Sequence, residues 1–216
     1  LQNPFLKTSF NTGSIISQQL SFNKTYAGKR NYRSTNFIRV AIEESGGVLG
    51  RIKSLQNDIY QYVKIEAEYR KLINYRKSSV AFRVFGGIGY NYGNSPKFGN
   101  TLPFYKQFVG GGPNSMRAWG LRLIGLGSSV FSDTSSSFRD RYGDMQLEAN
   151  AEYRFTVAQF SSVKIGGALF TDIGNVWNLH KAQEQTGSNF SFNRLGKDIA
   201  VGIGTGIRFD FSYFLI

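Results

Sequence analysis

Residues 144–155 alternate between polar and apolar side chains without interruption. The even positions from Gln146 to Arg154 are polar, and the odd positions from Leu147 to Phe155 are apolar. Successive side chains of a β-strand point to opposite faces of a sheet, so this segment is predicted to be a strand with one wet and one apolar face. The same period recurs along the chain without a helical pattern to cover the apolar faces. Such a sheet must form a sandwich, close on itself or lie in lipid.

Segments of strand length are predicted from this alternation and from the turn residues between them. Most have ten or more residues, which suits strands that cross a bilayer at a tilt, whereas strands of soluble sandwiches are typically about five or six residues long. A membrane barrel is therefore favoured over a soluble sandwich. Aromatic residues near segment ends are expected to form interfacial girdles: Tyr90, Tyr92, Trp177 and Tyr213. The eight predicted segments are 9–24, 35–42, 58–71, 79–92, 144–155, 162–176, 198–211 and a last one from residue 212 onward.

Residues 93–142 have no sustained period, and a stretch this long without secondary structure is usually functional or disordered. Within it, Gly110, Gly111 and Gly112 indicate tight turns and a close approach of the backbone. Arg117 then lies between the apolar residues Met116 and Trp119. A lone arginine among apolar neighbours indicates that this part of the loop packs against another surface.

Composition excludes several classes of function. The chain carries a net charge of +12, but its basic residues are scattered along the sequence. We therefore expect these charges to lie in a water-filled interior and on loops; anionic lipid headgroups are the next candidate partner, and nucleic acid is the last. There is no cysteine and only one histidine, His180, so neither thiolate chemistry nor a histidine-rich metal site is expected. We expect no cofactor, no metal and no catalytic residues. The chain has no initiating Met and no signal peptide, so we expect a mature fragment or part of a longer chain.

The glycine-rich segment followed by Met116, Arg117, Ala118 and Trp119 resembles the sixth extracellular loop of the BamA/TamA superfamily of outer-membrane assembly factors. The family pattern there is aliphatic–Arg–Gly–aromatic. This chain differs in having Met116 at the aliphatic position and Ala118 in place of the glycine. The later part of the chain continues the resemblance, since residues 143–155 and 167–177 are similar to the family's twelfth and thirteenth strands, and residues 200–214 also fit.

The resemblance implies a contact between this loop and the inner wall of a barrel, in which Arg117 pairs with Glu152 and Asp172. The alternation independently places both acids on the polar parity of their strands, and a guanidinium can bridge carboxylates through forked hydrogen bonds. The expected contact residues are Met116, Arg117, Ala118, Trp119, Glu152 and Asp172, with Gly110, Gly111 and Gly112 as the loop glycines.

We therefore expect residues 1–216 to be all-β, the C-terminal part of one antiparallel transmembrane β-barrel domain with a long extracellular loop at 93–142. About eight strands would belong to a barrel that has sixteen in the family. The resemblance implies a bacterial outer-membrane protein, not an enzyme, that inserts and folds other outer-membrane proteins. The implied partners are outer-membrane lipids and lipopolysaccharide, nascent outer-membrane proteins and accessory assembly subunits, with no nucleic acid.

Other functions remain open at this point. The chain could form a two-partner secretion translocator or pore of the same superfamily, the barrel anchor of a patatin-like phospholipase, or a plain porin. The sequence does not identify client proteins, and it does not separate a BamA-like from a TamA-like role.

Overall fold

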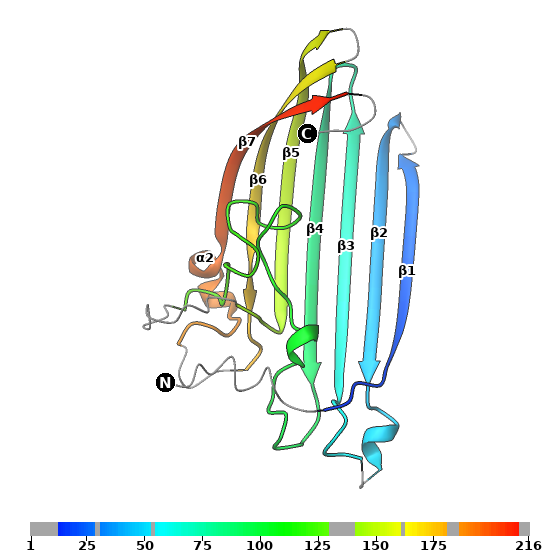
Figure 1. Cartoon of the computed structure of the whole chain (residues 1–216), viewed down its shortest axis with the longest axis vertical. Helices are drawn as coiled ribbons and strands as arrows, with labels where there is room; N and C mark the ends of the chain where they lie inside the picture. Colours follow the sequence, from blue (N-terminus) through cyan, green and yellow to red (C-terminus); the bar gives the residue numbers. More distant parts are fainter. Residues whose placement is uncertain are drawn as a thin grey trace.

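The computed structural model describes residues 13–28, 31–52, 55–129, 141–160, 163–180 and 186–211. In these residues seven antiparallel strands form one sheet, in which every strand pairs with its neighbours in sequence. Figure 1 shows the strands side by side as a curved wall. The strands are β1 Ser17–Gly28, β2 Asn31–Ser45, β3 Tyr62–Asn74, β4 Ser78–Asn91, β5 Met145–Phe160, β6 Val163–Trp177 and β7 Ala200–Asp210. The short helices are η1 Leu49–Arg51, η2 Phe104–Lys106, η3 Phe192–Arg194 and α2 Leu195–Asp198.

The predicted antiparallel all-β fold is confirmed, and seven of the eight predicted segments contain a strand. The last predicted segment, from residue 212 onward, lies outside the described residues, as do residues 9–12 of the first. The strand ends differ from the prediction. β1 begins at Ser17, and β2 extends on both sides of the predicted 35–42, because its backbone ladder to β1 continues past the apolar alternation.

The register gives the sheet two chemically different faces. Directly paired residues of an antiparallel sheet share a face, and polar positions are paired across strands, as in Asn150 with Asp172. On the other face apolar side chains are open, with Leu20 77%, Val84 54% and Ile203 79% exposed. A continuous apolar belt on the outside and polar residues on the inside are the arrangement of a barrel in lipid. None of the helices in the described residues is long and apolar enough to cross a membrane.

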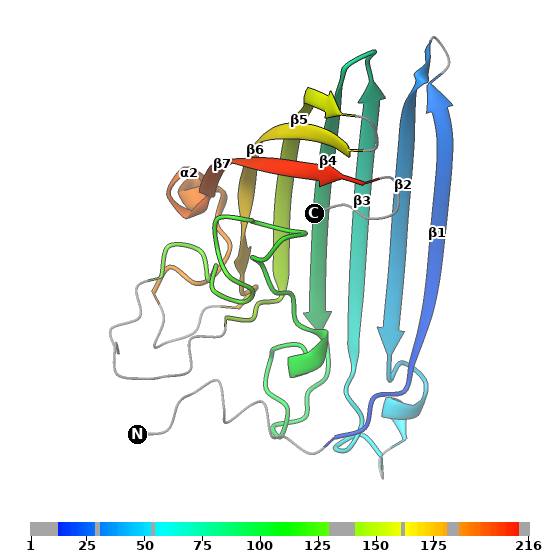
Figure 2. The same ribbon diagram turned by 45° about the horizontal axis from the view of Figure 1, so that its top comes forward.

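The two ends of the sheet carry connections of different length. Short connections join β1 to β2, β3 to β4 and β5 to β6 at one end, while residues 46–61, 92–144 and 178–199 form long connections at the other. The strands from β5 to β7 curl toward the side on which the longest connection lies (Figures 1 and 2). The long connection therefore lies against the polar face of the sheet rather than its apolar face.

Apolar side chains gather where the long connections meet the strand ends. A small core of aromatic and aliphatic residues lies there, and Leu102 and Phe108 of the long loop rest on Gly89 and Gly87 of β4, where any Cβ would collide with them. The loop base thus fits a notch that only glycines leave open.

The predicted aromatic girdle is wrong for Trp177. This side chain is 0% exposed, and its indole N–H donates to Asp198 Oδ2 at 3.0 Å, because the connection after β6 folds over it. Tyr90 is exposed as expected for a girdle residue, Tyr92 donates its hydroxyl to Glu44, and Tyr213 lies outside the described residues.

Candidate functional site

The tip of the long loop, residues 110–124, turns back on itself through two glycines. Gly111 and Gly112 have φ angles of 91° and 87°, in the left-handed region that side-chain-bearing residues rarely adopt. The N–H of Gly112 donates to the carbonyl of Trp119 at 2.8 Å. A Cβ on Gly111 would collide with the carbonyl oxygen of Gly120. The glycines therefore set the narrow shape that points residues 115–119 at the sheet.

Arg117 reaches from this tip to two acids on the polar face. Its Nε and Nη2 donate to the two oxygens of Asp172 at 2.9 and 2.7 Å, and Nη1 donates to Glu152. Its backbone N–H also donates to Asp172 Oδ2 at 2.9 Å. The guanidinium lies over the ring of Phe170, 3.7 Å from the centroid. The hydrogen bonds to Asp172 raise the pKa of Arg117, which keeps this side chain charged.

Asp172 is 0% exposed, and Asn150 supports it from the neighbouring strand. The amide of Asn150 donates to Asp172 Oδ1 at 3.0 Å and to the carbonyl of Ser115 at 3.1 Å. Asn150 and Asp172 are direct partners in the β5–β6 ladder, so the amide and the acid share one face. Asn150 thereby connects the wall to the loop backbone beside Arg117.

Glu152 is shared by three arginines from different parts of the chain. Arg117 donates to it from the loop, Arg154 Nε donates from β5 at 2.7 Å, and Arg208 donates from β7. Glu152 is only 8% exposed, so these cations provide the charge compensation that burial requires.

The other predicted contact residues lie around the arginine. Met116 is 0% exposed, while Ala118 and Trp119 approach Gly202 of β7. A Cβ on Gly202 would lie 2.8 Å from the Cβ of Ala118 and 3.1 Å from the Trp119 ring. The structure thus brings loop residues predicted from the sequence against three consecutive strands.

A second set of contacts, which was not predicted, lies beside the first. Ser115 donates its hydroxyl to Glu148, and Gln146 donates to the same carboxylate at 2.7 Å. Arg83 bridges Glu148 at 2.8 Å and Glu68 of β3 at 2.5 Å. Glu148 has the same parity as Glu152 on β5, and this was the one sequence signal that could have marked it.

The base of the loop is held separately. Lys106 Nζ lies 2.6 Å from Glu43 Oε1, and the hydroxyl of Tyr62 donates to the same oxygen at 2.7 Å. The loop is therefore fixed both at its base, on β2 and β3, and at its tip, on β5 to β7. In the part of the chain that the structure describes, no group of three or more His, Cys, Asp or Glu residues could hold a metal ion.

Comparisons with known proteins identify the fold and the family. The Omp85 superfamily domain matches residues 8–216. The crystal structure of BamA from Haemophilus ducreyi lacking POTRA domains 1–3 has a similar fold, with a TM-score of 0.57 and 16% sequence identity. The match covers 88% of this chain and 36% of that chain, so this chain spans about a third of the matched structure. The resemblance inferred from the sequence is confirmed, and the chain belongs to the Omp85 superfamily of outer-membrane β-barrel proteins.

Proposed function

We propose that this protein inserts and folds other β-barrel proteins in the bacterial outer membrane, and that residues 1–216 are the C-terminal part of its barrel domain. Family membership supports the general role. The observation that carries the proposal is the fork of Arg117 on Asp172 and its contact with Glu152, which tie a long loop to the inner wall.

The lengths of the connections support an orientation in the membrane. Outer-membrane barrels have short periplasmic turns and longer extracellular loops. The end with residues 46–61, 92–144 and 178–199 would then face outward, and the short connections would face the periplasm. In this orientation the predicted loop, residues 93–142, would lie on the extracellular side, with its tip folded back into the interior.

The contacts of the tip support a mechanical role for the loop. Asp172, Glu152 and Gly202 belong to β6, β5 and β7, so one loop segment braces three adjacent strands. Buried ion pairs contribute less to net stability than to fixing one arrangement, as proposed for other proteins. The loop would hold this part of the wall in one curvature while strand pairing proceeds at an edge elsewhere in the barrel.

Assembly itself needs no covalent chemistry on this account. Unpaired N–H and C=O groups at a strand edge are a template for an incoming strand, which would be the means of passing a client into the membrane. The proposed partners are nascent outer-membrane proteins, accessory assembly subunits, and the lipids and lipopolysaccharide around the barrel.

The test uses the full-length protein in liposomes with an unfolded outer-membrane protein as client. Arg117→Ala is expected to lower the rate of client folding by about tenfold, because a buried acid loses its cation. Lys97→Ala removes the same charge from an exposed loop position and is expected to leave the rate unchanged. Equal client folding by both variants would overturn the proposal, and a large ion conductance without client folding would favour a pore instead.

A further inference from the structure

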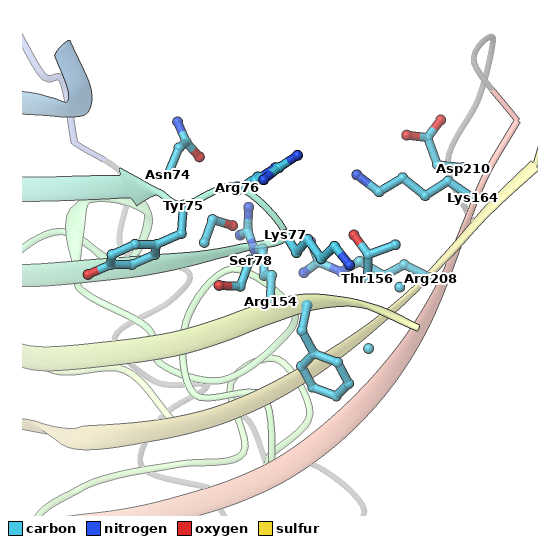
Figure 3. Close-up of a pocket in the computed structure, with 14 residues that line it drawn as sticks. Asn74, Tyr75, Arg76, Lys77, Ser78, Arg154, Thr156, Lys164, Arg208 and Asp210 are labelled. Carbon is cyan, nitrogen blue, oxygen red and sulfur yellow. The ribbon is translucent and has the colours of Figure 1, made fainter. Parts of the chain in front are cut away.

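A basic pocket lies on the polar face at the short-turn end of the sheet, next to the loop contact, with which it shares Glu152 as a partner of two of its arginines. Its cavity volume is about 270 Å³, and five cationic side chains and one acid line it. In Figure 3 the cationic side chains approach one space from the β3–β4 turn and from strands β5, β6 and β7. They are Arg76, Lys77, Arg154, Lys164 and Arg208, with Asp210 as the acid.

The positive charge of the pocket is only partly compensated. Arg154 and Arg208 both donate to Glu152, and Lys164 lies directly opposite Asp210 in the β6–β7 ladder. Within the described ranges, Arg76 and Lys77 form no ion pair, and both are exposed on the turn. An excess of positive charge therefore remains at the mouth of the pocket, where it attracts an anionic ligand.

The position of the pocket selects among anionic ligands. Arg154, Lys164 and Arg208 have the parity of the polar face, opposite to exposed apolar residues such as Ile203 and Ile207. Lipid headgroups beside the apolar face do not reach side chains on the inner face. A peptide on the polar face of the sheet does reach them, and a volume of this size accepts one or two side chains rather than a folded domain.

We propose that this pocket binds an acidic peptide segment, whose carboxylates pair with the cations of the β3–β4 turn and of β6. Arginine and lysine at such a site form charge-assisted hydrogen bonds with aspartate or glutamate. The proposal does not depend on assembly activity, because binding to the pocket can be measured without a client.

The variants are chosen to leave the loop contact intact. Arg154 and Arg208 share Glu152 with Arg117, so the test instead changes the turn, in Arg76→Ala/Lys77→Ala, and the pocket wall, in Lys164→Glu. The matched control, Lys97→Ala/Lys197→Ala, removes the same charge from exposed positions at the opposite end of the sheet.

The probe is a fluorescein-labelled peptide of consecutive glutamates, and its fluorescence anisotropy is measured with the full-length protein in nanodiscs of zwitterionic lipid at low ionic strength. We expect both pocket variants to weaken binding by about tenfold, and the control by less than about twofold. A glutamine peptide should not bind.

Three results would overturn the proposal. Equal weakening by the pocket and control variants would mean general attraction to a basic protein. Displacement of the peptide by inorganic phosphate at matched ionic strength would mean a simple anion site. Loss of peptide binding when phosphatidylglycerol is added to the nanodiscs would assign the pocket to lipid headgroups.

Discussion

Replacing Arg117 with alanine should release the loop tip from the wall, and the structure gives the magnitude. The Arg117 side chain is 21% exposed and that of Asp172 is 0% exposed, so the pair is largely desolvated. Removing one partner of a buried ion pair costs about 3–5 kcal/mol. The lower value applies here, because Asp172 keeps Asn150 and the backbone N–H of residue 117, and Glu152 keeps two arginines. About 3 kcal/mol corresponds to an increase of about 100-fold in the population of the open tip.

A buried thiol measures this opening. Met116 is 0% exposed and the chain has no cysteine, so Met116→Cys reacts with a maleimide only when the tip leaves the wall. Where the tip closes faster than it reacts, the labelling rate follows the open population. We expect Met116→Cys/Arg117→Ala to label about 100-fold faster than Met116→Cys alone.

The control removes another cation from the same acid. Arg154 also donates to Glu152 but belongs to the strand and is 40% exposed, so Met116→Cys/Arg154→Ala should change labelling by less than about threefold. If the Arg117 variant labels at the rate of its parent, the arginine does not hold the tip and the reasoning is refuted.

Three further outcomes are expected. Gly202→Ala adds a methyl group into the contact with the loop tip and should speed labelling at residue 116 by about tenfold, whereas Gly206→Ala, where a Cβ meets nothing within 4 Å, should not. Nitroxide labels at Tyr153 and Ile203 should collide with oxygen more than with an aqueous nickel chelate, and water-like accessibility would contradict the assigned faces. Burial raises the pKa of Asp144 above its ordinary 3.8, so the folded state holds a proton that the unfolded chain has lost, and stability falls as pH rises between the two pKa values. Asp144→Asn removes this pH dependence of stability. The melting temperature of the variant, followed by tryptophan fluorescence, should therefore rise relative to that of the parent toward alkaline pH. A difference in melting temperature that does not change with pH would contradict this expectation.

The faces of the sheet could be predicted because a period of two assigns a side chain to a face even when the strand ends are uncertain. Glu152 and Asp172 were placed on the polar face in this way, and the structure has both there. The ends of β1 and β2 were not predictable from alternation, since backbone pairing continues through residues of any polarity. Trp177 was misplaced because an aromatic residue at a strand end looks the same in sequence whether lipid or a folded connection covers it.

Partners of the loop could be predicted only where the family resemblance supplied them. Residues 93–142 have no period, so the path of the loop, and with it the contacts of Ser115 with Glu148 and of Lys106 with Glu43, did not follow from the sequence. The tip fits against Gly202 because glycine has no side chain. A glycine in a strand sequence does not show which residues occupy the space beside it. The charged residues are evident in the sequence, but which acid pairs with which base depends on how the loop packs on the sheet.

The strand order implies an order in which contacts form during folding. In the described residues each strand pairs only with its neighbours in sequence, so the sheet can grow one strand at a time, with short closures at one end and longer closures across residues 46–61, 92–144 and 178–199 at the other. The contact of Arg117 depends on a strand that follows later, because its acceptor Asp172 lies 55 residues further along the chain. The tip can contact Glu148 and Glu152 of β5 earlier, but its hydrogen bonds to Asp172 form only after β6 has joined β5, and they are a late step. A substitution that slows the β5–β6 pairing would delay this step without changing any atom of the loop.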